Sequence, residues 1–141
     1  MPTDESVFTA GTSFFITAEA PKRHLWFVLS DPAIDDEFVV YVNLTSFDGS
    51  RHTSLAWNDP ACVLDCGDYP QFITHRTCVC YGDAKVASIT SLDSRRQCKP
   101  PKLSIYGTVP VGMLAKARDG ATRSMHMPQE CLDILERQQL I

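Results

Sequence analysis

Two stretches between residues 24 and 46 combine a strand-like alternation of side chains with polar groups where apolar ones are usual. Successive side chains of a strand point to opposite faces, so residues 24–30 would place Leu25, Phe27 and Leu29 opposite His24, Trp26, Val28 and Ser30. Residues 39–46 alternate in the same way and carry Asn43, Thr45 and Ser46 toward their end. We predict two buried strands and a candidate site where the second one ends.

Further extended runs occur along the first ninety residues. They cover residues 12–17, 51–57, 62–65 and 77–89, and turn-forming residues are clustered at 31–36 and 48–50. Gly82 interrupts the last run, where we expect a bulge or a bend. These runs predict about five or six short antiparallel strands, in line with their period of two.

The pattern changes after Thr90. Residues 90–93 predict a brief helical turn, which Pro100 and Pro101 would interrupt. A helix is expected to start near Pro110 and to end before Gly120, and another to start at Pro128 with Cys131, Leu132 and Leu135 on one face. Strands followed by helices predict a mainly β fold, a small antiparallel barrel with helices at the C-terminal side.

Length and composition predict one domain. The 141 residues, 44% of them hydrophobic and 21% charged, match an ordinary globular chain with a single core. We expect a loose segment at 1–10, the barrel at 11–90, and a helical insert with the closing helix at 91–141. With no long apolar run and with acids near the start, the chain is expected to be cytoplasmic, without a membrane segment or export signal. The net charge of −4 argues against duplex DNA as a partner.

The cysteine spacing does not favour a metal site. Cys62 and Cys66 are separated by three residues and Cys78 and Cys80 by one, and no histidine follows at a ligand-like offset. We therefore expect buried or half-buried reduced thiols that behave as small apolar side chains, without a disulfide, a metal or a cofactor.

Three of the strand segments, 24–30 (H-L-W-F-V-L-S), 39–46 (V-V-Y-V-N-L-T-S) and 77–84 (T-C-V-C-Y-G-D-A), resemble strands of the MazF/PemK/Kid family of toxin components. The helix from Pro128 is similar to the family's final helix. The likeness covers about half of the chain. The resemblance implies an SH3-like barrel, a homodimer, single-stranded RNA as the substrate of metal-independent cleavage, and an antitoxin protein as a partner.

The chain also departs from the family. His24 stands where the family has an arginine, and Leu25 stands where it has a proline, whereas the threonine of the next strand is retained as Thr45. The insert between Ser91 and Gly120 has no counterpart in compact members. These differences fit a divergent branch.

Metal-free RNA cleavage needs a base for the 2′-OH proton, an acid for the leaving oxygen and a donor for the phosphorane charge. If the strand ends meet, His24 and His75 would be base and acid, and Thr45 a hydrogen-bond donor. Arg76 would clamp the phosphate, and the further substrate contacts would be Ser46, Arg23 and Asn43.

Other interpretations stay open for the same residues. The two histidines are also typical of a solvated surface, and the hydroxyl groups of Thr45 and Ser46 are also typical of strand caps. Asn43 is also typical of a residue with a structural hydrogen bond inside the sheet. The alternative function is a non-catalytic SH3-like binding module that contacts a protein partner, because fold does not fix function. A third hypothesis is an interaction protein whose added helices make the contact.

Overall fold

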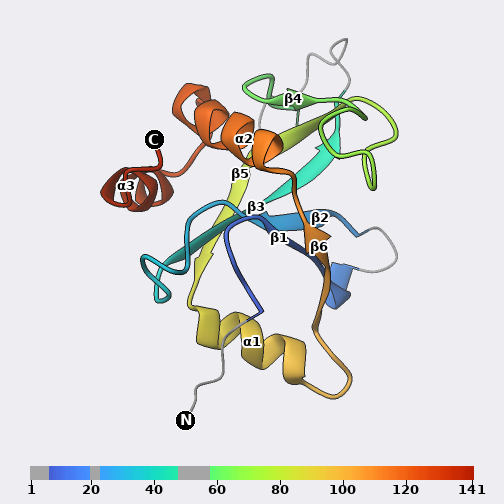
Figure 1. The fold of residues 1–141 in the computed structure, drawn as a ribbon, viewed down its shortest axis with the longest axis vertical. Helices are drawn as coiled ribbons and strands as arrows, with labels where there is room; N and C mark the ends of the chain where they lie inside the picture. The colour runs from blue at the N-terminus through green and yellow to red at the C-terminus, as the bar shows by residue number, and fades with distance from the viewer. Residues whose placement is uncertain (1–6, 20–22, 48–57) are drawn as a thin grey trace.

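One antiparallel sheet of six strands, in the order β4-β5-β3-β2-β1-β6, forms the centre of the computed structural model, which describes residues 7–19, 23–47 and 58–141 (Figure 1). The strands are β1 (Thr12–Ile16), β2 (Leu25–Val28), β3 (Val39–Ser46), β4 (Val63–Leu64), β5 (Thr77–Ala87) and β6 (Leu103–Thr108). Every pairing between them is antiparallel within this described part of the chain.

The helices follow the strands. After the short 3-10 helix η1 (Thr17–Glu19), the chain forms α1 (Ile89–Gln97), α2 (Val111–Arg123) and α3 (Gln129–Arg137). Helix α1 begins after Ser88, whose hydroxyl accepts a hydrogen bond from the amide of Ser91 at 3.0 Å, a common N-terminal cap. In Figure 1, α2 and α3 lie on one side of the sheet and α1 on the other.

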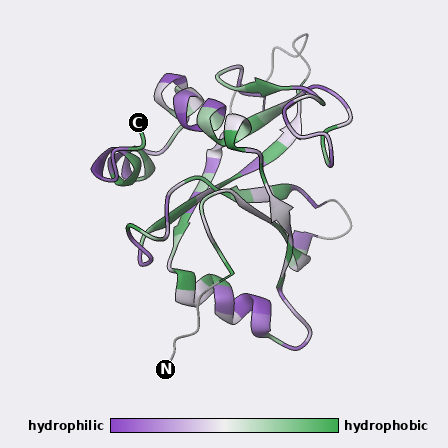
Figure 2. Cartoon of the chain, in the orientation of Figure 1, coloured by the Kyte–Doolittle hydropathy of each residue, from purple (hydrophilic) through white to green (hydrophobic). Residues whose placement is uncertain are grey.

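Both faces of the sheet are buried at the central strand β2. Leu25, Phe27 and Leu29 belong to one apolar cluster, which includes side chains of α2 and α3. Trp26 and Val28 belong to a second cluster, which includes side chains of α1. The alternation predicted for residues 24–30 is therefore confirmed, and Figure 2 shows the central strands mainly in hydrophobic colours while the second half of α1 is hydrophilic.

The sheet is not closed into a barrel, which corrects the sequence-based expectation. Its edge strands are β4 and β6, which do not pair with each other among the described residues. A barrel packs one face of its strands inside, whereas here apolar side chains emerge from both faces and each face needs its own cover. The helices supply these covers, and β4, with two residues, is too short to close the sheet.

Most of the expected strands are present. β1, β2, β3, β4 and β5 all lie within the predicted runs. The β3–β5 register shifts between Tyr41 and Asn43, opposite the part of β5 that contains Gly82, so the expected irregularity is confirmed. The predicted turn at 48–50 and strand at 51–57 lie outside the described residues.

The region after Thr90 differs from expectation in three ways. Helix α1 has nine residues rather than a single turn. Strand β6 was not expected, and it pairs with β1 at the edge of the sheet. Gly120 lies inside α2 and not beyond its end. Close packing explains why this position is a glycine, because a Cβ there would come 2.7 Å from the Cβ of Cys62. Helix α3 follows Pro128 as predicted.

Candidate functional site

Three chain segments meet at one end of the sheet. Because β2 and β3 are antiparallel, with Trp26 opposite Asn43, the start of β2 lies beside the end of β3. The end of β3 also pairs with the start of β5, where Ser46 is opposite Thr77. The side chains that precede β2, end β3 and precede β5 are thereby brought together, as the sequence analysis required for its candidate site.

A cleft of about 250 Å³ lies at this end of the sheet. Five of the seven predicted site residues line it, together with three apolar or polar neighbours that sequence reasoning missed. The full lining is Arg23, His24, Leu44, Thr45, Ser46, Phe72, His75 and Thr77. The cleft thus contains two imidazoles, one guanidinium and three hydroxyl groups.

His24 is held by the backbone of the neighbouring strand. Its Nδ1 lies 3.1 Å from the carbonyl oxygen of Leu44, and the side chain is half-buried. A carbonyl oxygen only accepts hydrogen bonds, so Nδ1 carries the proton and donates. In the neutral ring Nε2 therefore holds the lone pair, which makes this atom the one that can accept a proton.

His75 is held by hydroxyl groups on both ring nitrogens. Its Nε2 lies 2.7 Å from Oγ of Ser46, and its Nδ1 lies 3.2 Å from Oγ1 of Thr74. A hydroxyl both donates and accepts, so these partners fit the neutral ring and also the imidazolium, whose two N–H groups both donate. The two hydroxyl groups are therefore compatible with a proton on either ring nitrogen.

Aromatic rings border the cleft next to Arg23. The guanidinium carbon of Arg23 lies 4.9 Å from the ring centroid of Phe15, a cation–π distance. The ring of Phe15 lies 6.2 Å from that of Phe72, which lines the cleft. Phe72 precedes His75 by three positions in a Pro-containing loop, and its sequence context carried no period that would have indicated a site.

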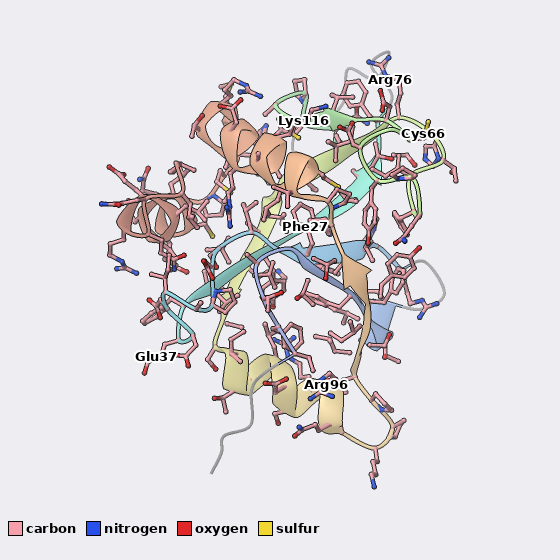
Figure 3. The ribbon with its side chains drawn as sticks, viewed as in Figure 1. Phe27, Glu37, Cys66, Arg76, Arg96 and Lys116 are labelled. Carbon is pink, nitrogen blue, oxygen red and sulfur yellow. The ribbon has the colours of Figure 1, made fainter. Side chains whose placement is uncertain are left out.

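Two predicted site residues do not line the cleft. The guanidinium carbon of Arg76 lies 5.5 Å from the ring centroid of Phe47, and Figure 3 shows this arginine at the periphery of the molecule. Asn43 is buried in the sheet, where its Nδ2 donates to Oδ2 of Asp83 at 3.3 Å. Its Oδ1 has no hydrogen-bond partner among the described residues. Arg23, and not Arg76, is therefore the arginine that lines the cleft, and Asn43 is buried within the sheet.

Four of the six thiols are buried, and burial keeps them protonated. It raises the pKa of Cys62, Cys80 and Cys131 to about 11 and that of Cys78 to about 12. Cys66 is exposed and Cys98 is half-buried. The expectation of small apolar thiols therefore holds for the four buried cysteines, and Cys66 departs from it.

Across ranges 7–19, 23–47 and 58–141, no three His, Cys, Asp or Glu side chains gather in a way that would hold a metal ion. Within the same ranges, no helix has the length and apolar character needed to cross a bilayer.

Comparison with known proteins gives no assignment for this arrangement of residues. No protein-family model and no curated protein sequence matches the chain.

Proposed function

We propose that the chain is an endoribonuclease that cleaves single-stranded RNA without a metal ion, through His24 and His75. The observation that carries the proposal is the shared cleft, in which two differently held imidazoles, Arg23 and the hydroxyls of Thr45 and Ser46 come together. Paired imidazoles beside a cation suit transfer of a phosphoryl group between two oxygens, since this reaction needs one proton removed, one proton added and negative charge stabilised.

The reaction begins at the ribose 2′-OH. Nε2 of His24 takes the hydroxyl proton while the 2′ oxygen attacks the adjacent phosphorus. The bond from phosphorus to the 5′ oxygen of the next nucleotide breaks, and His75 donates a proton to that oxygen. The products are a 2′,3′-cyclic phosphate and a free 5′-OH, so that protons and electrons balance without any co-reactant.

The hydrogen bonds favour this division of the two roles. Nδ1 of His24 is committed to the carbonyl of Leu44, which leaves Nε2 as a proton acceptor. Both nitrogens of His75 lie within hydrogen-bond distance of hydroxyl oxygens, which are able to accept from a ring N–H. These contacts support His24 as the base and His75 as the acid in the direction of cleavage.

Arg23 supplies the positive charge for the scissile phosphate. It lines the cleft with the two histidines, whereas Arg76 does not. The hydroxyl of Thr45 also lines the cleft and is the neutral hydrogen-bond donor for the phosphorane charge. A cleft of about 250 Å³ has room for one phosphodiester and part of a flanking nucleoside, which suits an unpaired strand better than a duplex.

The resemblance to MazF/PemK/Kid toxin components extends this proposal. It implies that the sheet is a divergent relative of their SH3-like barrel, that the protein is a cytoplasmic homodimer, and that an antitoxin protein binds it. The retained Thr45 and the meeting of the three matched strand segments at the cleft support this extension. His24, at the family's arginine position, lies in the same cleft.

The test is cleavage of a random-sequence, single-stranded RNA pool by the purified protein in the presence of EDTA. We expect cleavage to persist in EDTA because the proton transfers use histidines. The fragments should carry 2′,3′-cyclic phosphate ends, identified by mass spectrometry, because the 2′ oxygen is the nucleophile. A pool in which every 2′-OH is replaced by hydrogen should remain intact. Intact RNA with the folded protein would overturn the proposal and leave the binding-module hypothesis. Products with 5′-phosphate ends would overturn the proposed mechanism, because they would show cleavage that does not use the 2′ oxygen.

A further inference from the structure

Four aromatic rings from three separate segments form one cluster beside the cleft. Phe15 is in β1, Tyr69 and Phe72 are in the loop before β5, and Tyr106 is in β6. The ring centroid of Tyr106 lies 5.6 Å from those of Phe15 and Phe72, and 6.3 Å from that of Tyr69. Phe72 connects this cluster to the cleft, because it also lines the cleft wall.

The cluster is both fixed and accessible. The hydroxyl of Tyr106 donates to the carbonyl oxygen of Gln71 at 2.9 Å, and the hydroxyl of Tyr69 lies 3.2 Å from Oγ of Ser13. Yet Tyr106 is 40% exposed, and Phe15 and Phe72 are only half-buried. A ring that is already held in place loses little conformational freedom when a ligand packs on it.

We infer that this cluster, with Tyr106 and Phe72 at its surface, is a stacking subsite for an unpaired nucleobase next to the cleaved phosphodiester. Every nucleobase offers a flat π face, so stacking on an aromatic side chain tolerates any sequence. This inference rests on the proposed function and identifies the part of the substrate that the cleft itself is too small to hold.

Arg23 is the observation that favours a nucleotide over an apolar peptide. It lines the cleft with the two histidines and at the same time lies over the ring of Phe15. A cation between an aromatic surface and a phosphate-sized cleft matches the alternation of base and phosphate along a nucleic acid strand. A purely apolar partner would have to cover this charged guanidinium at a cost in free energy, whereas a phosphate would pair with it.

The experiment compares two fluorescein-labelled single-stranded DNA pools, because DNA lacks the 2′-OH and is not cut. One pool is ten nucleotides of random sequence, and the other has the same length but is abasic at all internal positions. Binding is measured by anisotropy for the parent protein, Tyr106→Ala, Tyr106→Phe and Ile105→Ala. Ile105 is the matched control, since it is also 40% exposed in β6 and is not part of the ring cluster.

Loss of one stacked base typically weakens binding about tenfold, so Tyr106→Ala should bind the base-bearing pool about tenfold more weakly. Its binding to the abasic pool should be unchanged, and the other two variants should stay within about twofold of the parent. Circular dichroism and thermal unfolding check that each variant is folded.

Three results would overturn the inference. One is equal affinity of the parent protein for both pools, or no binding of either pool. Another is an equal loss of affinity for both pools in Tyr106→Ala. The third is a change from dimer to monomer in Tyr106→Ala by light scattering, which would make the cluster a self-association surface. Base-dependent binding through Tyr106 in a protein that cuts no RNA would keep the subsite and overturn only the nuclease proposal.

Discussion

Oγ of Ser46 and Nε2 of His75 lie 2.7 Å apart, although Ser46 ends one strand and His75 precedes another. The contact depends on the β3–β5 pairing, in which Ser46 is opposite Thr77. The hydroxyl of Thr77 in turn donates to the carbonyl oxygen of His75 at 2.9 Å, which fixes the backbone next to the imidazole. His75 is thus positioned by the ends of two strands, even though its own side chain is exposed.

Replacing either histidine of the cleft should strongly reduce RNA cleavage. His24→Ala and His75→Ala should each lower the cleavage rate by roughly 10²–10⁴, the usual contribution of a general base or acid. His126→Ala is the control, since His126 lies after α2 and lines a different cavity. Rates are measured on single-stranded RNA after circular dichroism has shown each variant to be folded. Parental rates in both cleft variants would refute the assignment.

Replacing Ser46 should have a much smaller effect than replacing His75. Ser46→Ala removes one hydrogen bond to the imidazole and should lower the rate only about threefold to tenfold, the weight of a single neutral hydrogen bond. Thr45→Val should likewise cost less than either histidine. Ser91→Ala, an exposed serine of α1, is the matched control. A loss as large as that of His75→Ala would instead indicate that Ser46 is itself a nucleophile paired with His75.

Gly120→Ala should destabilise the protein. The added Cβ would overlap the hydroxyl oxygen of Tyr81 and would lie 2.7 Å from the Cβ of Cys62. Tyr81 cannot easily move away, because its buried hydroxyl donates to the carbonyl oxygen of Ala117 at 2.6 Å. Overpacking of this kind costs about 1–3 kcal/mol in the free energy of unfolding, measured by urea denaturation.

Gly112→Ala is the control for this substitution, since it lies in the same helix and a Cβ there has nothing within 4 Å. It should raise the free energy of unfolding by up to about 1 kcal/mol, as expected for alanine over glycine in a helix. If both alanine variants are equally stable, the contact with Tyr81 does not constrain α2.

The free energy of unfolding should fall as the pH rises above 9. Burial raises the pKa of Cys78 from 9.0 to about 12 and that of Cys62 from 9.0 to about 11. The unfolded chain therefore releases these protons near pH 9 while the folded chain still holds them, so alkaline pH favours unfolding. Below pH 9 both states are protonated, and these thiols contribute no pH dependence.

Urea denaturation at pH 8, 9 and 10 measures the slope of the free energy of unfolding against pH. Cys78→Ala should reduce the slope, even though it also lowers the overall stability by removing buried volume. Cys66→Ala is the control, because this thiol is exposed and the substitution should leave the slope unchanged. An identical slope in Cys78→Ala and the parent would contradict the argument.

The sequence predicted the parts of the fold that depend on local alternation. Residues 24–30 and 39–46 carried enough apolar side chains on alternate positions to reveal both strands, and the polar groups at their ends marked the cleft. Strand β6 gave no such signal, because Leu103 is its single fully buried residue and its apolar residues Ile105 and Tyr106 are adjacent.

The missed features of the site depend on tertiary contacts. Whether Arg23 or Arg76 faces the cleft is decided by the neighbours of each side chain: Arg76 lies over Phe47 and Arg23 over Phe15. Gly120 was expected beyond α2 because glycine is common after helices, but close packing against Cys62 and Tyr81 required glycine within it. Phe47 is far in sequence from Arg76, and Cys62 and Tyr81 are far from Gly120, so local sequence does not reveal these contacts.

The pairing of β1 with β6 has a consequence for how the chain folds. The hydroxyl of Thr17 donates to the carbonyl oxygen of Pro101, 84 positions away, at the point where these two strands meet. Contacts between residues so distant in sequence require closure of a long loop, which slows folding. During synthesis, β1 can pair with β6, its second neighbour in the sheet, only after most of the chain has left the ribosome. The ring cluster of Phe15 and Tyr106 therefore assembles late, and a translational pause before residue 103 would leave one edge of β1 open to pairing with another chain.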